Sequence, residues 1–282
     1  MNYTIAVIGA GLMGNGIAQT CAQAGFSVIN IDTCSTAIDK AIASMHTLYD
    51  KKIQKGSLTP QQKIELFSRI RFESTFDNIA NATLIIEAVP ENIELKKEIF
   101  QQIDKIASPD AIILSNTSGL SISEMASVTS RPDKVMGAHF FYPAPVMKLL
   151  ELIRGLATSD ETYNFVKEFA LSIGKTIVNA PEYPGFIVNR LLVLMQNEAA
   201  FLVMEGCKAA DVDTAMKLGT NHPMGPLELA DFVGVDIVLA TINGIYTGFK
   251  DSKYRPCPLL ENMVKAGHLG RKSGRGFYNY TT

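Results

Sequence analysis

Two side chains in the middle of the sequence, His139 and Glu151, could together move a proton. His139 lies near the end of an apolar stretch, residues 135–140, and Glu151 lies within another, residues 149–153. If the second stretch is a strand, alternation places Glu151 on an apolar face, where an unpaired carboxylate is costly. A carboxylate bound to one imidazole nitrogen fixes the tautomer and leaves the other nitrogen to act as a base. We therefore predict an acid–base pair; the alternatives are a structural histidine and a solvated edge-strand glutamate.

Three further polar residues are candidates for the same chemistry. Ser118 follows the apolar stretch 111–114, so it is either a reactive hydroxyl at a strand end or a turn or helix-capping serine. Asn189 lies early in a long apolar helical stretch, where an amide either binds a ligand or satisfies a domain junction. His222 is a rival base, but the proline-rich residues 221–226 are typical of a helix–helix connection. We therefore prefer His139 as the base.

A glycine pattern near the N-terminus could bind a dinucleotide. Residues 9–14 (GAGLMG) match G-x-G-x-x-G, follow an apolar stretch, and open a helical pattern. Asp32 ends the next apolar stretch, where a carboxylate would accept hydrogen bonds from the adenosine ribose. Asp32 would repel a 2′-phosphate, and no arginine lies between it and Arg69, so NAD is favoured over NADP. FAD and a glycine turn without a ligand are the alternatives. The predicted cofactor residues here are Gly9, Gly11, Leu12, Met13, Gly14 and Asp32.

The candidate site residues can act together only if the fold brings the ends of several strands close to one another. Helical patterns separate most of the apolar stretches, which predicts an α/β fold with a Rossmann-type doubly wound sheet. After Pro184 the sequence becomes long, apolar and helical, with no convincing strand. We predict an NAD-binding Rossmann-type domain over residues 1–183 and a smaller all-α domain over residues 184–282, with the active site in the cleft between them. The predicted strands are residues 4–9, 27–32, 82–88, 111–114, 135–140 and 149–153.

Composition narrows the class of protein. The chain has 26 Lys plus Arg against 28 Asp plus Glu, a formal charge of −2, with 47% hydrophobic residues, as in packed globular proteins. Near-neutral charge gives no reason to expect nucleic-acid binding. The sequence shows no long uninterrupted apolar run and no basic stretch before the N-terminal apolar segment, so we expect no membrane association and a cytoplasmic location. The four cysteines have no metal-binding spacing, so no metal is predicted.

The motifs together resemble the L-3-hydroxyacyl-CoA dehydrogenase family, most closely its bacterial short-chain 3-hydroxybutyryl-CoA dehydrogenase group. The resemblance covers essentially all 282 residues. In this family the second domain is helical and forms the dimer interface, so the resemblance implies a homodimer. The segments that carry it are VIGAGLMG at 7–14, EAVPEN at 87–92, SNTS at 115–118, HFF at 139–141, PVMKL at 145–149, PGFIVNR at 184–190, NHPMGP at 221–226 and GRKSG at 270–274.

The resemblance also implies a reaction, the reversible NAD-dependent oxidation of a short-chain L-3-hydroxyacyl-CoA to the 3-oxoacyl-CoA. His139 would be the catalytic base and Glu151 its orienting partner. Ser118, near the cofactor, and Asn189 would hold the substrate at the reacting carbon. The resemblance further implies that Glu91 and Lys96 contact the nicotinamide half of NAD. The alternatives are a hydroxyacid or L-gulonate-type dehydrogenase on the same fold, and a non-catalytic NAD-binding module.

Several further positions bear on the substrate. Ser44 and Lys51 fall where the family contacts coenzyme A, and Lys55 joins them because Lys51, Lys52 and Lys55 crowd one helical stretch. A solvated helix face is the alternative for these lysines. Similar enzymes usually carry asparagine three residues after the catalytic histidine, and this chain has Tyr142. A phenol cannot reproduce the paired donor and acceptor of an amide, so Tyr142 is outside the predicted site.

Overall fold

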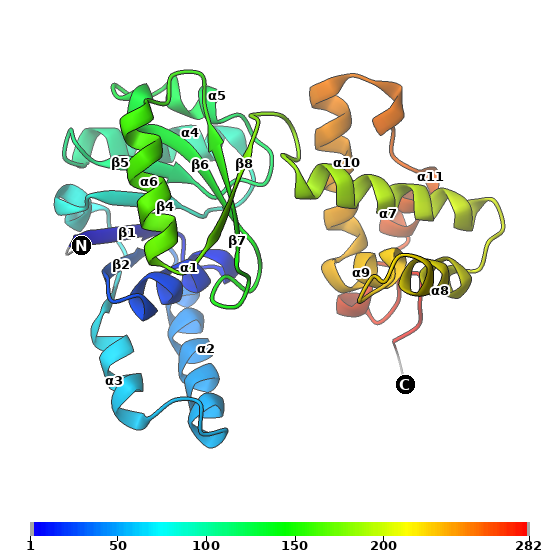
Figure 1. Cartoon of the computed structure of the whole chain (residues 1–282), viewed down its shortest axis with the longest axis horizontal. Helices are drawn as coiled ribbons and strands as arrows, with labels where there is room; N and C mark the ends of the chain where they lie inside the picture. The colour runs from blue at the N-terminus through cyan, green and yellow to red at the C-terminus, as the bar shows by residue number, and fades with distance from the viewer. Residues whose placement is uncertain (1–2, 281–282) are drawn as a thin grey trace. The chain divides into compact units, whose positions relative to one another are not determined.

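The chain divides into two compact units, one ending at Glu182 and the other beginning at Tyr183. The structure is a computed structural model that describes residues 3–280. The first unit is built on one eight-stranded sheet with the strand order β3-β2-β1-β4-β5-β6-β7-β8 (Figure 1). Strands β6 and β7 run antiparallel, and the other neighbouring pairs run parallel. The strands are β1 (Thr4–Ile8), β2 (Ser27–Ile31), β3 (Ile70–Glu73), β4 (Leu84–Glu87), β5 (Ile112–Ser115), β6 (Val135–Phe140), β7 (Leu149–Arg154) and β8 (Thr176–Ala180).

The central strands form because their sequences are mostly apolar, as expected for parallel strands covered on both faces. Every residue of β4, β5 and β6 is buried. The predicted α/β doubly wound fold is therefore confirmed. Two edge strands, β3 and β8, were not among the predicted strands. Both are short, and both expose polar side chains such as Arg71 and Asn179, so their sequences lack the apolar pattern of a central strand.

Helices cover both faces of this sheet, and Figure 1 shows α6 in front of the strands and α4 behind them. On the α6 side, Phe169 packs in one core cluster with Ile17 of α1 and Leu150 of β7. The pair α2 and α3 extends away from the sheet as a helical hairpin (Figure 1). The helices are α1 (Leu12–Gln23), α2 (Ser35–Gln54), α3 (Pro60–Ser68), α4 (Ile93–Ile106), α5 (Ile122–Ala126) and α6 (Asp160–Ser172), with the 3-10 turns η1 (Asp77–Asn81) and η2 (Pro132–Lys134).

The second unit is helical, as predicted, around a core that includes Val193, Val238 and Leu260. Its first helix, α7, begins at Val188 rather than at Gly185, because Gly185 and Phe186 have φ angles of 79° and 47° and cannot continue a right-handed helix. The helices are α7 (Val188–Met204), α8 (Ala209–Gly219), α9 (Pro226–Val233), α10 (Val235–Phe249) and α11 (Pro258–Lys265), with the 3-10 turns η3 (Ser252–Tyr254) and η4 (Arg271–Ser273).

No single helix between residues 3 and 280 has both the length and the apolar character needed to cross a membrane. The consecutive helices α9 and α10 meet that test only when taken together, and they are bent by 101° where they meet.

Candidate active site

The predicted glycine motif forms the turn between β1 and α1, beside the point where the strand order reverses between β1 and β4. Gly9 has a φ of 106°, and a Cβ there would lie 2.6 Å from the Ala88 carbonyl oxygen. A Cβ on Gly14 would lie 1.9 Å from the Gly9 carbonyl oxygen. By contrast, a Cβ on Gly11 would meet no heavy atom within 4 Å. Gly9 and Gly14 are therefore required by packing, whereas the backbone at Gly11 is open to an approaching phosphate.

The start of α1 has the features of a phosphate-binding helix end. Gly11 is the N-cap, and Leu12 and Met13 are the first two helical residues. The first backbone N–H groups of a helix have no partner within the helix, and the helix dipole is positive there. Leu12 is exposed and Met13 partly buried, so this end of α1 is accessible to a dinucleotide pyrophosphate. The start of α1 therefore fits the pyrophosphate of the predicted NAD cofactor.

Asp32 follows β2 and is held against the glycine turn. Its Oδ2 accepts a hydrogen bond from the Ala10 N–H at 2.8 Å, and its Oδ1 accepts one from the Cys34 N–H at 2.9 Å. The carboxylate is partly exposed at the carboxyl edge of the sheet. This is the position from which an acidic side chain reaches adenosine ribose hydroxyls in doubly wound folds.

His139 and Glu151 come from neighbouring antiparallel strands and are paired residues in the β6–β7 register. The His139 Nδ1 atom lies 2.8 Å from the Glu151 Oε2 atom. Glu151 is completely buried, and the His139 side chain is 6% exposed. The structure therefore brings together the two residues that strand alternation predicts to interact.

Ser118 lies in the loop after β5, next to Thr117. Glu91 Oε1 accepts hydrogen bonds from the Thr117 hydroxyl at 2.6 Å and from the Ser118 N–H at 2.8 Å. The same loop also contacts β6, because Asn116 Oδ1 accepts a hydrogen bond from the Phe140 N–H at 2.9 Å. Ser118 and Glu91, both predicted site residues, are thus joined directly, and their loop is hydrogen-bonded to the strand that carries His139.

Lys96, which the resemblance implies to be a cofactor contact, is buried in this structure. Its side chain is 1% exposed, and its Nζ atom lies 2.5 Å from Oε1 of Glu87, a buried residue that sequence reasoning did not single out. Lys96 Nζ is also 3.5 Å from Glu91 Oε2. A carboxylate at the end of an apolar strand, as at Asp32, is the signal that could have identified Glu87.

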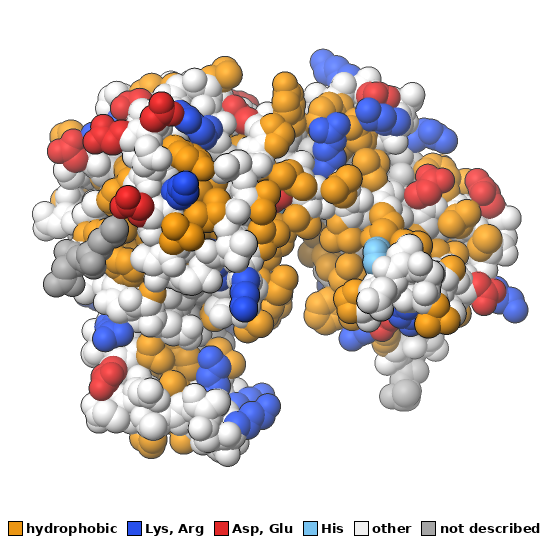
Figure 2. Space-filling model, viewed as in Figure 1, with side chains coloured by type: hydrophobic (Ala, Val, Ile, Leu, Met, Phe, Trp, Pro, Cys, Tyr) orange, Lys and Arg blue, Asp and Glu red, His pale blue; other side chains and the backbone are white. Residues whose placement is uncertain are grey.

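Ser44, Lys51 and Lys55 lie along α2 and at its end. Ser44 Oγ accepts a hydrogen bond from Asn15 Nδ2 at 3.0 Å, so Ser44 lies beside α1. The three residues are seven and eleven positions apart, so at 3.6 residues per turn they share one helix face. Lys51 and Lys55 are exposed near the tip of the α2–α3 hairpin, where Figure 2 shows several basic side chains together. Lys52 instead lies over the Tyr49 ring, 5.9 Å from its centroid.

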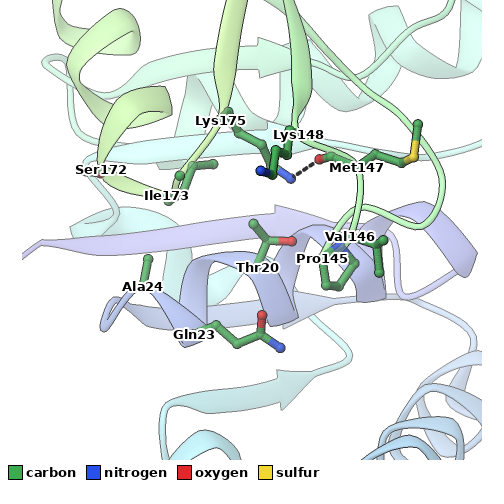
Figure 3. Close-up of a pocket in the computed structure, with 11 residues that line it drawn as sticks. Thr20, Gln23, Ala24, Pro145, Val146, Met147, Lys148, Ser172, Ile173 and Lys175 are labelled. Carbon is green, nitrogen blue, oxygen red and sulfur yellow. Dashed lines mark hydrogen bonds between the residues drawn. The ribbon is translucent and has the colours of Figure 1, made fainter. Parts of the chain in front are cut away.

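The first unit also contains a cavity of about 340 Å³ (Figure 3), and none of its lining residues is a predicted site residue. Its buried Lys175 donates hydrogen bonds to the carbonyls of Ala144 and Met147, the latter at 2.7 Å. Burial lowers the pKa of Lys175. Lys175 therefore tethers the loop that joins β6 to β7, the two strands of the histidine–glutamate pair. The cavity is lined by Thr20, Gln23, Ala24, Pro145, Val146, Met147, Lys148, Ser172, Ile173, Gly174 and Lys175.

Tyr142, which is outside the predicted site, follows β6 and is 53% exposed. Asn189 lies in the first turn of α7, and His222 lies in the connection between α8 and α9, both in the second unit. Within residues 3–280, no group of three or more His, Cys, Asp or Glu side chains is arranged to hold a metal ion.

A doubly wound sheet, a glycine turn at the reversal of strand order and an aspartate after β2 place the chain among the dinucleotide-binding dehydrogenases. Two family matches make the assignment specific. Residues 4–183 match the 3-hydroxyacyl-CoA dehydrogenase NAD binding domain, and residues 185–280 match the 3-hydroxyacyl-CoA dehydrogenase C-terminal domain. The chain belongs to the 3-hydroxyacyl-CoA dehydrogenase family and is an NAD-dependent enzyme. The predicted family and the predicted NAD cofactor are confirmed.

Individual relatives match along nearly the whole chain. A probable 3-hydroxybutyryl-CoA dehydrogenase of Bacillus subtilis is 48% identical over 277 residues, covering 98% of this chain and 96% of that protein. The 3-hydroxybutyryl-CoA dehydrogenase of Clostridioides difficile is 46% identical over 277 residues, covering 98% of this chain and 99% of that protein. The crystal structure of (S)-3-hydroxybutyryl-CoA dehydrogenase from Ralstonia eutropha superposes with a TM-score of 0.96 at 46% identity, over 100% of both chains.

Proposed function

We propose that the protein catalyses the reversible oxidation of a short-chain L-3-hydroxyacyl-CoA, 3-hydroxybutyryl-CoA, to acetoacetyl-CoA. The names of the relatives, at 44–48% identity over nearly the full chain, support this substrate. The observation that carries the chemistry is the 2.8 Å contact between His139 Nδ1 and Glu151 Oε2. It provides a buried acid–base pair on the side of the sheet where the parallel strands end, and the glycine turn lies on the same side.

In the proposed mechanism His139 moves one proton. NAD, when bound, supplies the hydride chemistry at C3 of the substrate. Because Glu151 contacts Nδ1, that nitrogen carries the ring proton and Nε2 is the acceptor for the proton of the 3-hydroxyl. As the hydroxyl is oxidised, the imidazole becomes an imidazolium, and the buried Glu151 carboxylate stabilises its positive charge. In the reductive direction the imidazolium returns this proton to the carbonyl oxygen.

Ser118 and Asn189 have proposed roles in holding the substrate at C3, as the resemblance implies. The Ser118 backbone is bonded to Glu91, so its hydroxyl is carried by a loop of defined position. Glu91 is proposed to contact the nicotinamide half of NAD. Its side chain is 43% exposed although one oxygen already accepts two hydrogen bonds. A group that is both fixed and accessible suits a contact to the cofactor.

We propose that Ser44, Lys51 and Lys55 bind coenzyme A. A row of one hydroxyl and two ammonium groups on one helix face suits an extended polyanion, because each cation can meet a different phosphate. At 1.5 Å per residue, the row from Ser44 to Lys55 is about 16 Å long. The lysines near the tip would then bind phosphate groups, and Ser44, next to α1, would contact a part of the substrate nearer to the cofactor.

We also propose a homodimer formed through the second unit. Hydrophobic side chains are exposed on this unit (Figure 2). Phe232, Val233 and Ile237, around the α9–α10 junction, are 53%, 40% and 48% exposed. Adjacent exposed apolar side chains are typical of protein contacts. Light scattering at several protein concentrations tests the proposal: a dimer is expected, and Ile237→Glu should weaken it.

The substrate class is tested by comparing acyl-CoA with free acids. NADH oxidation is measured with acetoacetyl-CoA, with acetoacetate, and with longer 3-oxoacyl-CoA compounds, and NAD reduction is measured with L-gulonate. We expect acetoacetyl-CoA to have the highest kcat/KM. Equal turnover of acetoacetate would argue for a hydroxyacid dehydrogenase, and NADH binding without turnover of any acyl-CoA would argue for a non-catalytic module.

A further inference from the structure

A buried carboxylate, Glu87, lies at the carboxyl end of β4 beside the glycine turn. In the sheet register Glu87 pairs with Ile8 on one side and Ser115 on the other. Its side chain is completely buried. Oε1 accepts a hydrogen bond from the Val89 N–H at 2.7 Å, and Oε2 accepts one from the Ser115 hydroxyl at 2.6 Å. Neither the predicted site nor the proposed mechanism uses this carboxylate.

The counter-ion of Glu87 is Lys96, which also approaches a second carboxylate. The Lys96 ammonium lies 2.5 Å from Glu87 Oε1 and 3.5 Å from Glu91 Oε2. It also donates a hydrogen bond to the Val89 carbonyl at 3.2 Å. One buried ammonium therefore lies between two carboxylates, and the shorter contact is made with the completely buried one.

Glu91 completes a closed ring of contacts. Its Oε1 accepts hydrogen bonds from the Thr117 hydroxyl and the Ser118 N–H. The Thr117 N–H in turn donates to Ser115 Oγ at 3.2 Å, and Ser115 binds Glu87. The ring joins the loop after β4 to the loop after β5. These are the loops that carry Glu91 and Ser118, the proposed contacts to the nicotinamide and the substrate.

Charge balance shows what Glu87 does in this ring. A buried ammonium needs a counter-ion, and Glu87 provides it at short distance. If Glu87 were neutral, Glu91 would be the carboxylate left within 4 Å of the ammonium among the residues that the structure describes. Glu91 Oε2 would then be drawn toward Lys96, which would pull Oε1 away from Thr117 and Ser118.

We propose that Glu87 is a positioning residue for the dehydrogenase reaction. Its negative charge holds Lys96, so that Glu91 keeps its bonds to Thr117 and Ser118 and remains available to the nicotinamide half of the cofactor. This inference rests on the proposed function, because the proposed function identifies the nicotinamide and the substrate as the groups that Glu91 and Ser118 contact.

The test compares Glu87→Gln, Glu87→Asp and wild type. Glutamine keeps the shape of Glu87 without its charge, so kcat with acetoacetyl-CoA should fall at least about tenfold. The Kd for NADH should change less than about threefold, because the glycine turn and Asp32 are intact. Aspartate keeps the negative charge that holds Lys96, so the kcat of Glu87→Asp should be at least about threefold higher than that of Glu87→Gln. Lys97→Met is the matched control, because Lys97 is on the same helix and its side chain is 25% exposed.

Two outcomes would overturn the proposal. One is a Glu87→Gln enzyme with wild-type kcat. The other is a folded Glu87→Asp enzyme whose kcat is no higher than that of Glu87→Gln, because the charge of Glu87 would then not be the property that matters. If Glu87→Gln does not fold, Glu87→Asp decides, because a kcat more than about tenfold below wild type despite the retained charge would contradict the proposal. The fluorescence of bound NADH gives a readout without substrate: Glu87→Gln should change it and Glu87→Asp should restore most of it. Absence of wild-type turnover would count against the proposed function and not against this inference.

Discussion

His139 and Glu151 face each other across the β6–β7 pairing, with Nδ1 and Oε2 2.8 Å apart and the carboxylate completely buried. We expect His139→Gln to lower kcat by about 10²–10⁴-fold, the usual contribution of a positioned acid or base. Glu151→Gln keeps the shape but loses the charge that stabilises the imidazolium, so a smaller loss of at least about tenfold is expected. The measurement is steady-state NADH oxidation with acetoacetyl-CoA.

A matched control for this pair is His222→Gln, which changes a histidine in the connection between α8 and α9. Its turnover should stay near that of wild type. Near-wild-type rates for both His139→Gln and Glu151→Gln, or a large loss in His222→Gln, would show that another group moves the proton.

The glycine turn gives a second prediction, in which the effect of a substitution on stability can be distinguished from its effect on cofactor binding. Gly11→Ala adds a methyl group where no heavy atom lies within 4 Å, so stability should change by about 0.5 kcal/mol or less. That methyl group would occupy space needed by the pyrophosphate, and the Kd for NADH should rise at least about tenfold. Gly14→Ala places a Cβ 1.9 Å from the Gly9 carbonyl oxygen and should lower the melting temperature as well. Thermal unfolding and NADH fluorescence titration separate the two effects. If Gly11→Ala bound NADH as tightly as wild type does, we would conclude that the pyrophosphate does not bind at this turn.

The lysines of α2 allow a third prediction with a control on the same turn of helix. Lys51→Glu should raise the KM for acetoacetyl-CoA at least about tenfold at low ionic strength, and less at ~1 M salt, where charges are screened beyond ~3 Å. Lys52→Glu makes the same charge change, but Lys52 lies over the Tyr49 ring. Its effect on the KM should be clearly smaller. Equal effects of the two variants would mean that only the overall charge of the hairpin matters.

Cys34 provides a chemical probe of the predicted adenosine site. A hydrogen bond with the Thr36 hydroxyl, 3.1 Å away, lowers the pKa of the exposed Cys34 thiol. A lower pKa means more thiolate at any pH below the ordinary thiol value, so the rate of alkylation by iodoacetamide should rise at lower pH than for a typical cysteine. The Cys34 N–H is bonded to Asp32, so bound NADH should slow the reaction. Peptide mass spectrometry measures both effects, with Cys34→Ser as the blank. Alkylation unaffected by NADH would contradict this placement of the adenosine.

The structural features that can be predicted from the sequence depend on local properties. The glycine spacing, the acid after β2 and the alternation around Glu151 can each be read within a few residues of the sequence. The structure places His139 and Glu151 in contact for the reason expected, because a carboxylate on an apolar strand face needs a partner.

The parts that sequence reasoning misses depend on distant partners or on weak patterns. Glu87 meets Lys96 nine residues away and Ser115 28 residues away, and no local pattern links the three. For the same reason, nothing in the sequence near Lys96 shows that its side chain is buried in the fold. The edge strands β3 and β8 escape prediction because exposed polar side chains interrupt their apolar pattern.

The hairpin formed by β6 and β7 has a consequence for how the chain folds. His139 and Glu151 are only 12 positions apart in the chain, whereas the Ala10–Asp32 and Glu87–Ser115 contacts span 22 and 28 positions. Parallel neighbours need a crossover before they can pair, but a hairpin closes a short loop at low entropic cost. The proposed proton-transfer pair therefore lies within one contiguous segment, residues 135–154, and its formation during folding does not have to wait for the crossovers that build the cofactor edge.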